Sequence, residues 1–302
     1  MIDVREIDEY IKTKQYRLIN SFLVWQDGKT IIERYYNGFT KESRNVIRSV
    51  VKSILSISTG ICLNQGLIKS LDEPIYRYLN DFNQSIHPYH KAITIRHLLT
   101  MTSGIYWVGG VHYHCPMLDQ LFRVNNCIEQ IADTDMADVP GMKYVYKEWD
   151  VILLSDLISK ATKMSTYDFC ARNLYGPLGI KSGEWAKFKN GVDYNISLNS
   201  KLETRSDLSA RDLAKLGLLF LDNGRNIVSE SYVKETVLPS RNAQNYGLLW
   251  WLFEDGYGCM GYGGQEIKVI PNKNMVYVIQ ATATAQAKSY GDVFQIINSQ
   301  MQ

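Results

Sequence analysis

The most informative stretch of the chain spans residues 48–58 and reads Arg-Ser-Val-Val-Lys-Ser-Ile-Leu-Ser-Ile-Ser. Its apolar and small residues, running on toward Gly60, predict a buried helix. Because positions three apart share a helix face, the Ser49 hydroxyl would lie beside the Lys52 amine. Such an amine can take the proton of a serine nucleophile, although most Ser-x-x-Lys pairs are exposed helix residues. Burial further predicts a lowered pKa for Lys52, because desolvation favours the neutral amine.

The sequence on either side of this helix predicts strands near both termini and helices between them. Asp27-Gly28, between two strand-like runs, is a hairpin turn signal. The expected strands are residues 21–25, 30–36, 246–253, 257–261, 265–270 and 275–281. The expected helices are residues 3–14, 49–66, 94–100, 127–132, 149–162, 210–222 and 291–301.

These elements predict an α+β fold rather than a doubly wound βαβ chain. One antiparallel sheet would be built from both termini and flanked by helices, with an inserted, mostly helical domain. We expect residues 1–66 and 231–302 to form the sheet domain and residues 67–230 to form the helical domain.

Bulk composition excludes several classes of function. The 302 residues are 45% hydrophobic and 21% charged, enough for a sizeable core. A net charge of +2 implies no nucleic-acid partner. The charged start has no apolar signal region, and no apolar run is long enough to span a membrane. The five cysteines are scattered and form no Cys-x-x-Cys pair. We therefore expect free thiols, a cytoplasmic protein and no membrane partner.

A second long motif spans residues 93–107 and reads Ile-Thr-Ile-Arg-His-Leu-Leu-Thr-Met-Thr-Ser-Gly-Ile-Tyr-Trp. Together with Ser-Val-Val-Lys, it resembles the serine β-lactamase and penicillin-binding-protein-like hydrolases. The resemblance covers roughly residues 20–285, and its last motifs look most like the branch of 6-aminohexanoate-oligomer hydrolases and related esterases. Further matching motifs lie at residues 140–146, 174–180, 211–217, 246–251 and 261–265.

The resemblance implies a catalytic role for Tyr146, the tyrosine of the family's second motif. Its phenol would share proton transfer with Lys52 as general base and then general acid. By residue type alone Tyr146 is one of 20 tyrosines. The chain departs from the family at Glu148, which replaces the usual asparagine, and Asp150 is an alternative acidic residue of this motif. Both are candidate substrate-binding residues, and either would change the polar surroundings of Lys52.

The third motif is best matched by Cys259-Met260-Gly261, where the family usually has Lys or His first. Losing that cation argues against substrates with a carboxylate. The backbone amides of Ser49 and Tyr262 would form the oxyanion hole, with Gly261 allowing close approach of the substrate. A register shift would place Gly264 and Gln265 at this position instead, and Gly-Tyr-Gly-Gly is also typical of a plain hairpin turn. Further candidate substrate-binding residues are Trp107 on the cleft rim, Cys259, Gly263 and Gly264.

Metal and triad chemistry are not expected. His112, His114 and Cys115 have a pattern that suits a metal, but no second Cys/His cluster follows. No histidine follows residue 114, which excludes a triad that uses a late histidine. We expect His97 to pack or to form a hydrogen bond, without a catalytic role. No cofactor is expected.

The leading hypothesis is a serine hydrolase that cleaves small-molecule esters or amides through an acyl-enzyme on Ser49, with Lys52 and Tyr146 moving the proton. Within enzymes, the alternative is a β-lactamase or a D-amino-acid-type peptidase. A different class is a non-catalytic sensor or binding module that is acylated without turnover. The fold by itself does not choose among these three.

Overall fold

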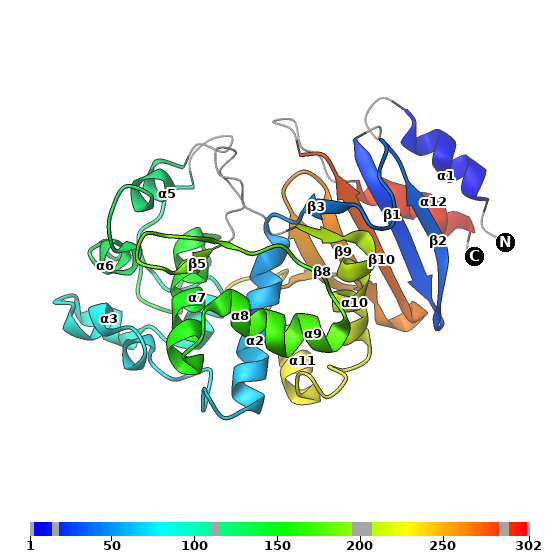
Figure 1. Cartoon of the computed structure of the whole chain (residues 1–302). Coiled ribbons are helices and arrows are strands. Elements are labelled where there is room, and N and C mark those ends of the chain that lie inside the picture. The colour runs from blue at the N-terminus through cyan, green and yellow to red at the C-terminus, as the bar shows by residue number, and fades with distance from the viewer. Residues whose placement is uncertain (1–2, 14–17, 110–114, 195–206, 284–289, 301–302) are drawn as a thin grey trace.

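The computed structural model, which describes residues 3–13, 18–109, 115–194, 207–283 and 290–300, confirms the α+β class. The main sheet combines strands from both ends of the chain in the order β2-β1-β10-β9-β8-β7, with every neighbouring pair antiparallel (Figure 1). Its strands are β1 (Ile19–Gln26), β2 (Lys29–Tyr35), β7 (Trp251–Phe253), β8 (Gly256–Gly261), β9 (Gln265–Ile270) and β10 (Met275–Ala281).

The first hairpin forms where the sequence predicts it. Gln26 pairs with Lys29, so the turn consists of Asp27 and Gly28 alone. Both residues have positive φ, +47° and +85°, as a type I′ hairpin turn requires. On its other edge β1 pairs with β10, so the two ends of the chain share the middle of the sheet.

Helices cover both faces of the sheet. Helices α1 (Val4–Ile11) and α12 (Gly291–Gln300) lie side by side on one face, where the Tyr277 and Phe294 rings stack with centroids 4.2 Å apart (Figure 1). Helix α10 (Ala210–Leu221) packs on the other face. A Cβ on Gly217 would lie 2.6 Å from a methyl carbon of Val276, so glycine permits this close contact.

The helical part of the molecule is centred on α2 (Val50–Asn64) and α7 (Glu148–Thr162), which pack against each other. Residues 50–62 of α2 are all buried, as the apolar sequence predicts. The shorter α-helices are α3 (Asn80–Gln84), α4 (Ile95–Leu99), α5 (Pro116–Leu121), α6 (Cys127–Ala132), α8 (Thr166–Cys170), α9 (Gly176–Leu178) and α11 (Glu230–Thr236).

Short irregular elements complete the described chain. Two small sheets pair β3 (Arg44–Val46) with β6 (Asp207–Ser209) and β4 (Ala186–Lys187) with β5 (Asp193–Tyr194). The 3-10 turns are η1 (Ile75–Arg77), η2 (Pro88–Ala92) and η4 (Pro271–Lys273), and η3 (Ala171–Tyr175) is a π-helical turn.

One detail differs from the sequence-based expectation. The expected strand over residues 246–253 begins only at Trp251, because Leu249 has a left-handed φ of +60° and its N–H donates to the carbonyl of Leu99. Such a backbone cannot continue a strand ladder.

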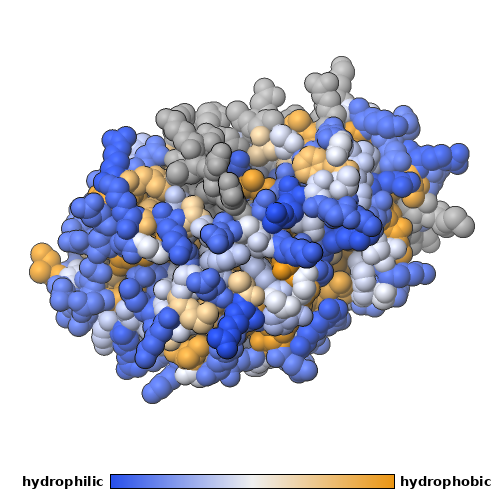
Figure 2. Space-filling model, viewed as in Figure 1, coloured by the Kyte–Doolittle hydropathy of each residue, from blue (hydrophilic) through white to orange (hydrophobic). Residues whose placement is uncertain are grey.

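The visible surface is mostly hydrophilic, with small scattered apolar patches (Figure 2). Among the residues that the structure describes, no helix is both long enough and apolar enough to cross a membrane.

Candidate active site

Ser49 lies at the start of α2, where the buried helix meets the surface. It is the N-cap residue, and its side chain caps no backbone N–H. Its side chain is partly exposed, whereas the helix that follows is buried. The preceding residue, Arg48, has a positive φ of +52°, a conformation that a non-glycine residue adopts at some energetic cost. This sharp entry into the helix leaves the serine hydroxyl accessible at the helix end.

Lys52 lies beside Ser49, as the helical spacing predicts, but its pKa is shifted in the direction opposite to the prediction. Its Nζ is 3.3 Å from Ser49 Oγ and 2.6 Å from Glu148 Oε1. Burial alone would lower the pKa of Lys52, but the carboxylate of Glu148, with a contribution from Tyr146, raises it above its ordinary value. The predicted lowering is therefore wrong, because the sequence does not show that α7 brings a negative charge to the amine.

Tyr146 also contacts Lys52, and its ring packs against two other aromatic side chains. Lys52 Nζ lies over the Tyr146 ring, 5.1 Å from its centroid. The ring stacks on Trp251 at 5.9 Å and meets Tyr246 edge-on at 6.2 Å. No role was predicted for Tyr246 or Trp251. Both belong to the motif at residues 246–251, which is the feature of the sequence that could have indicated a place near the site.

The end of β8 approaches the backbone just before Ser49. A Cβ on Gly261 would lie 2.4 Å from the carbonyl oxygen of Ile47, so only glycine fits without a shift. Tyr262, the next residue, lies close to Arg48, where burial lowers the pKa of Arg48 and Tyr262 opposes that shift. This places both predicted oxyanion-hole residues, Ser49 and Tyr262, at the same junction between α2 and β8.

The remaining candidates around the third motif lie in different surroundings. Cys259 is 1% exposed, and its thiol faces Ser53 of α2 in the core, where burial raises the thiol pKa to about 12. Gly263 and Gly264 form the turn after β8 with φ of +86° and +87°. Cβ atoms there would meet Ala283 and Tyr290, on the side of the turn that faces the C-terminal segment.

Trp107 and Asp150 lie near the N-terminal end of α7. Trp107 is partly buried and meets Trp149 edge-on with centroids 4.8 Å apart. Asp150 is fully buried and accepts a hydrogen bond from the Ser103 hydroxyl, while burial raises its pKa to about 6. Lys147 donates to the carbonyl of Ile105 at 2.8 Å. Lys147 and Asp150 thus lie among the residues of the Thr-Ser-Gly motif, and Glu148 is the acidic residue that meets Lys52.

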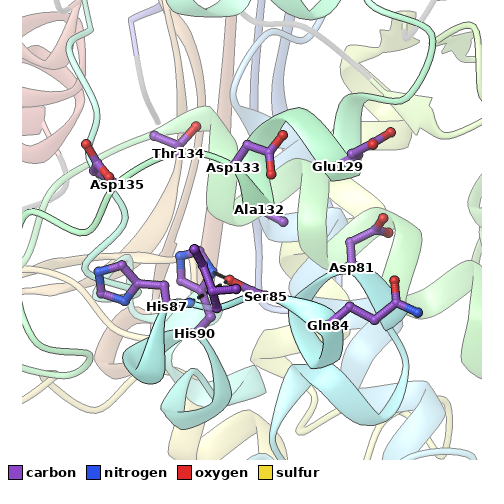
Figure 3. A pocket seen from close by; sticks show the side chains of 11 residues that line it. Asp81, Gln84, Ser85, His87, His90, Glu129, Ala132, Asp133, Thr134 and Asp135 are labelled. Carbon is purple, nitrogen blue, oxygen red and sulfur yellow. Dashed lines mark hydrogen bonds between the residues drawn. The ribbon is translucent and has the colours of Figure 1, made fainter.

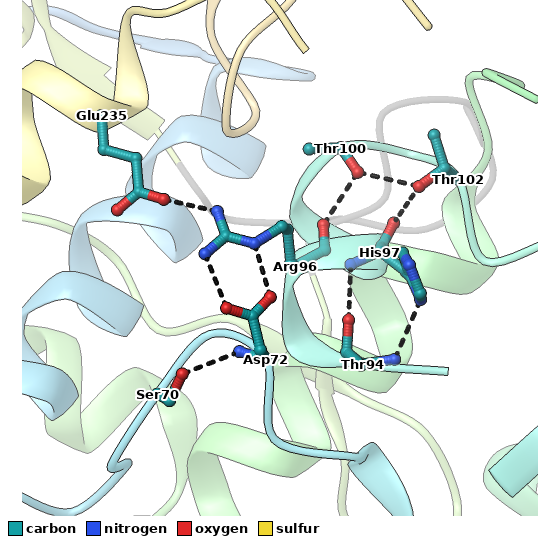
Figure 4. Close-up of polar contacts among 8 residues, drawn as sticks. All are labelled: Ser70, Asp72, Thr94, Arg96, His97, Thr100, Thr102 and Glu235. Atoms are coloured by element: carbon teal, nitrogen blue, oxygen red, sulfur yellow. Dashed lines mark hydrogen bonds and ion pairs between the residues drawn. The ribbon is translucent and has the colours of Figure 1, made fainter. Parts of the chain in front are cut away.

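His97 forms hydrogen bonds, as its place in the 93–107 motif predicts. Its Nδ1 accepts from the backbone N–H of Thr94, while the Thr94 hydroxyl accepts from the backbone N–H of His97 (Figure 4). This reciprocal pair caps α4. Next to it, Arg96 bridges Asp72 and Glu235 and thereby ties α4 to α11 (Figure 4).

No metal centre is found in the described part of the chain, where no group of three or more His, Cys, Asp or Glu side chains could hold an ion. His112 and His114 lie outside the described residues, and Cys115 is buried with its Sγ 3.4 Å from the carbonyl of Val108. A separate acidic pocket between α3 and α6 includes His87 and His90, with His90 bonded to Ser85 (Figure 3). The residues that line this pocket do not include Ser49, Lys52 or Tyr146.

A family model described as Beta-lactamase matches residues 7–299. The chain belongs to the beta-lactamase family. An uncharacterised protein of Alkalihalophilus pseudofirmus is 27% identical over 267 residues, 77% of this chain and 71% of the relative.

Solved structures of the same fold include hydrolases of several kinds. A Bacillus anthracis protein, described as a candidate 6-aminohexanoate-dimer hydrolase, matches with a TM-score of 0.72 and 16% identity over 99% of this chain and 80% of its own. EstCE1, a hydrolase with promiscuous acyltransferase activity, matches with a TM-score of 0.75 and 14% identity over 98% of this chain and 96% of its own. At these identities the likeness shows the fold, and the fold is that of serine β-lactamase-like hydrolases.

Proposed function

We propose that this chain is a serine hydrolase that cleaves small, uncharged esters or amides through an acyl-enzyme on Ser49. The observation that carries the proposal is the meeting of Ser49, Lys52 and Tyr146 at one helix end, with a 3.3 Å distance between the serine oxygen and the lysine nitrogen. A hydroxyl within reach of a proton-accepting group is the arrangement that nucleophilic catalysis needs.

In the proposed reaction, the Ser49 oxygen attacks the substrate carbonyl as its proton passes to Lys52. The backbone amides of Ser49 and Tyr262 stabilise the oxyanion, and the close approach of Gly261 to the Ile47 carbonyl, which brings the end of β8 to the residues before Ser49, supports this assignment. Lys52 and Tyr146 then supply a proton to the leaving group, and water releases the acid.

The charges around the nucleophile favour uncharged substrates. The charge of Lys52 is matched by Glu148, and the third-motif position holds the buried, neutral Cys259. Lys147, another cation of this region, is occupied by Ser103 and the Ile105 carbonyl. A substrate carboxylate that loses its hydration without a matching cation is disfavoured by several kcal/mol. We therefore expect turnover of simple esters well above that of penicillins.

The Lys52–Glu148 ion pair also favours one alternative, an acylated sensor without turnover. An ammonium group cannot accept a proton, so a site that keeps Lys52 charged would deacylate slowly. The two functions differ in turnover: the hydrolase releases product repeatedly, whereas the sensor stops after one equivalent.

The test is a paired assay with a chromogenic acetate ester and a chromogenic cephalosporin, together with labelling by a fluorophosphonate probe. We expect repeated turnover of the ester, little turnover of the cephalosporin, and one probe equivalent that is absent in Ser49→Ala. Labelling that persists in Ser49→Ala would disprove the scheme. A single stoichiometric burst on the ester would support the sensor instead.

A further inference from the structure

Ser49, Lys52 and Glu148 are arranged in series, with the lysine nitrogen between the other two side chains. Lys52 Nζ lies 3.3 Å from the serine oxygen and 2.6 Å from the glutamate oxygen. The side chains of Lys52 and Glu148 are only 1% and 5% exposed. A lysine–carboxylate contact of this length is at the short end of charge-assisted hydrogen bonds, so a proton needs to move only a small distance between the two groups.

Lys52 alone is poorly suited to start the reaction. Burial would lower the pKa of Lys52, but Glu148 and Tyr146 raise it above its ordinary value, so the free amine is scarce near neutral pH. The Glu148 carboxylate is 2.6 Å from Lys52 Nζ and reaches Ser49 through that nitrogen, so it can receive a proton that Lys52 gives up.

We propose that Lys52 and Glu148 act as one proton-accepting unit, in which Glu148 takes a proton from Lys52 as Lys52 takes the proton of Ser49. This inference rests on the proposed hydrolase function and makes Glu148 a positioning residue that acts through Lys52. The asparagine that the family usually has at this position could accept a hydrogen bond from Lys52 but could not take up its proton.

The transfer balances within the site. As the Ser49 Oγ–carbon bond forms, the carbonyl π electrons move to the oxyanion. The serine proton passes to Lys52 Nζ, and a different Nζ proton passes to Glu148 Oε1, which leaves a neutral carboxylic acid. When the bond to the leaving group breaks, Lys52 gives that group a proton and recovers one from Glu148. The unit then returns to its starting ion pair, ready for attack by water.

The titratable groups that face Glu148 come from several elements. Lys52 on α2 and Tyr146 before α7 lie at the nucleophile. Burial raises the pKa values of Tyr246 and Cys115, and the nearby Glu148 charge adds to both shifts. Asp193 faces Glu148 across a small cavity between α7 and β5. Apart from Lys52, these neighbours are acids, and the ion pair with Lys52 brings a positive charge to 2.6 Å from the Glu148 carboxylate.

The test is the pH dependence of Ser49 acylation by a chromogenic ester, measured in the wild type and in Glu148→Gln. If the unit operates, the limb along which the wild-type rate rises lies at a pH well below the range in which a lysine amine loses its proton, and the rate stays flat above that rise. In Glu148→Gln the base must be the free amine of Lys52, so we expect the limb to move upward by about one pH unit or more. Glu148→Asp, which keeps a carboxylate, should keep the low limb at a reduced rate.

The opposite shift would overturn the inference. If Glu148 only holds Lys52 charged, the wild-type limb lies in the amine range, above about pH 9, and Glu148→Gln moves it downward. If Glu148→Gln fails to fold, the pH at which the wild-type acylation rate rises distinguishes the two possibilities by itself. Glu266→Gln, a change at a buried glutamate bonded to Tyr277, is the matched control and should leave the limb unchanged. Absence of any Ser49 acylation in the wild type would instead refute the proposed function.

Discussion

Breaking the buried ion pair between Lys52 and Glu148 should destabilise the fold, and restoring neutrality should recover most of the loss. In Glu148→Gln the ammonium of Lys52 remains buried without its carboxylate. Removing one partner of such a pair typically costs about 3–5 kcal/mol. This loss of unfolding free energy has an upper limit, because Lys52 can release its proton and remain buried as a neutral amine. At pH 7, about 3.5 units below the ordinary pKa of 10.5, that limit is about 4.8 kcal/mol.

The pH dependence of this loss has a definite sign. In the wild type Glu148 raises the pKa of Lys52, so the stability it contributes is fully present below pH 10.5 and is lost as the pH rises through the raised value. In Glu148→Gln burial, which lowers that pKa, is opposed only by Tyr146, so we expect the pKa of Lys52 to fall below its ordinary value. The unfolded variant then binds more protons than the folded one, so its stability rises with pH, by up to about 1.4 kcal/mol per pH unit. The difference in unfolding free energy between the wild type and Glu148→Gln should therefore become smaller from pH 7 to pH 9.

The assay is urea unfolding followed by circular dichroism for the wild type, Lys52→Met, Glu148→Gln and the double variant. Each single variant should lose about 3–5 kcal/mol at pH 7, whereas the double variant should lie within about 1–2 kcal/mol of the wild type. The double variant should remain inactive, because its nucleophile has no base. Single losses below about 1 kcal/mol that simply add in the double variant would refute the reasoning.

Two further predictions concern the geometry around the site. Gly261→Ala should reduce kcat/KM for esters by about 10²-fold with little loss of fold, because its Cβ would press on the Ile47 carbonyl and displace β8 from Ser49; unchanged kinetics would contradict the assignment of this junction. Arg96→Gln should lower stability by about 1 kcal/mol through its contacts with Asp72 and Glu235, less so in high salt; a loss of ester turnover at unchanged urea midpoint would contradict this structural role.

Much of the fold could be predicted because it follows from local patterns. Alternating and apolar runs predict strands at both ends of the chain, and Asp27-Gly28 fixes the first hairpin. The helical spacing that joins Ser49 to Lys52 is likewise a property of one continuous segment. The expected strand over residues 246–253 failed at its first half, where a tertiary hydrogen bond to Leu99 and the left-handed Leu249 replace the extended backbone.

Local sequence patterns were enough to predict the fold class and the pairing of Ser49 with Lys52, because a helix brings residues three apart together. The charges that surround Lys52 depend instead on tertiary contacts. Glu148 is 96 residues from Lys52 in the sequence, and α7 brings its carboxylate to 2.6 Å from the amine. Tertiary packing also turned Asp150 toward Ser103 and the Cys259 thiol toward Ser53. The pKa of a buried group depends on the charges that the fold places around it, and a local pattern of residues does not contain that information.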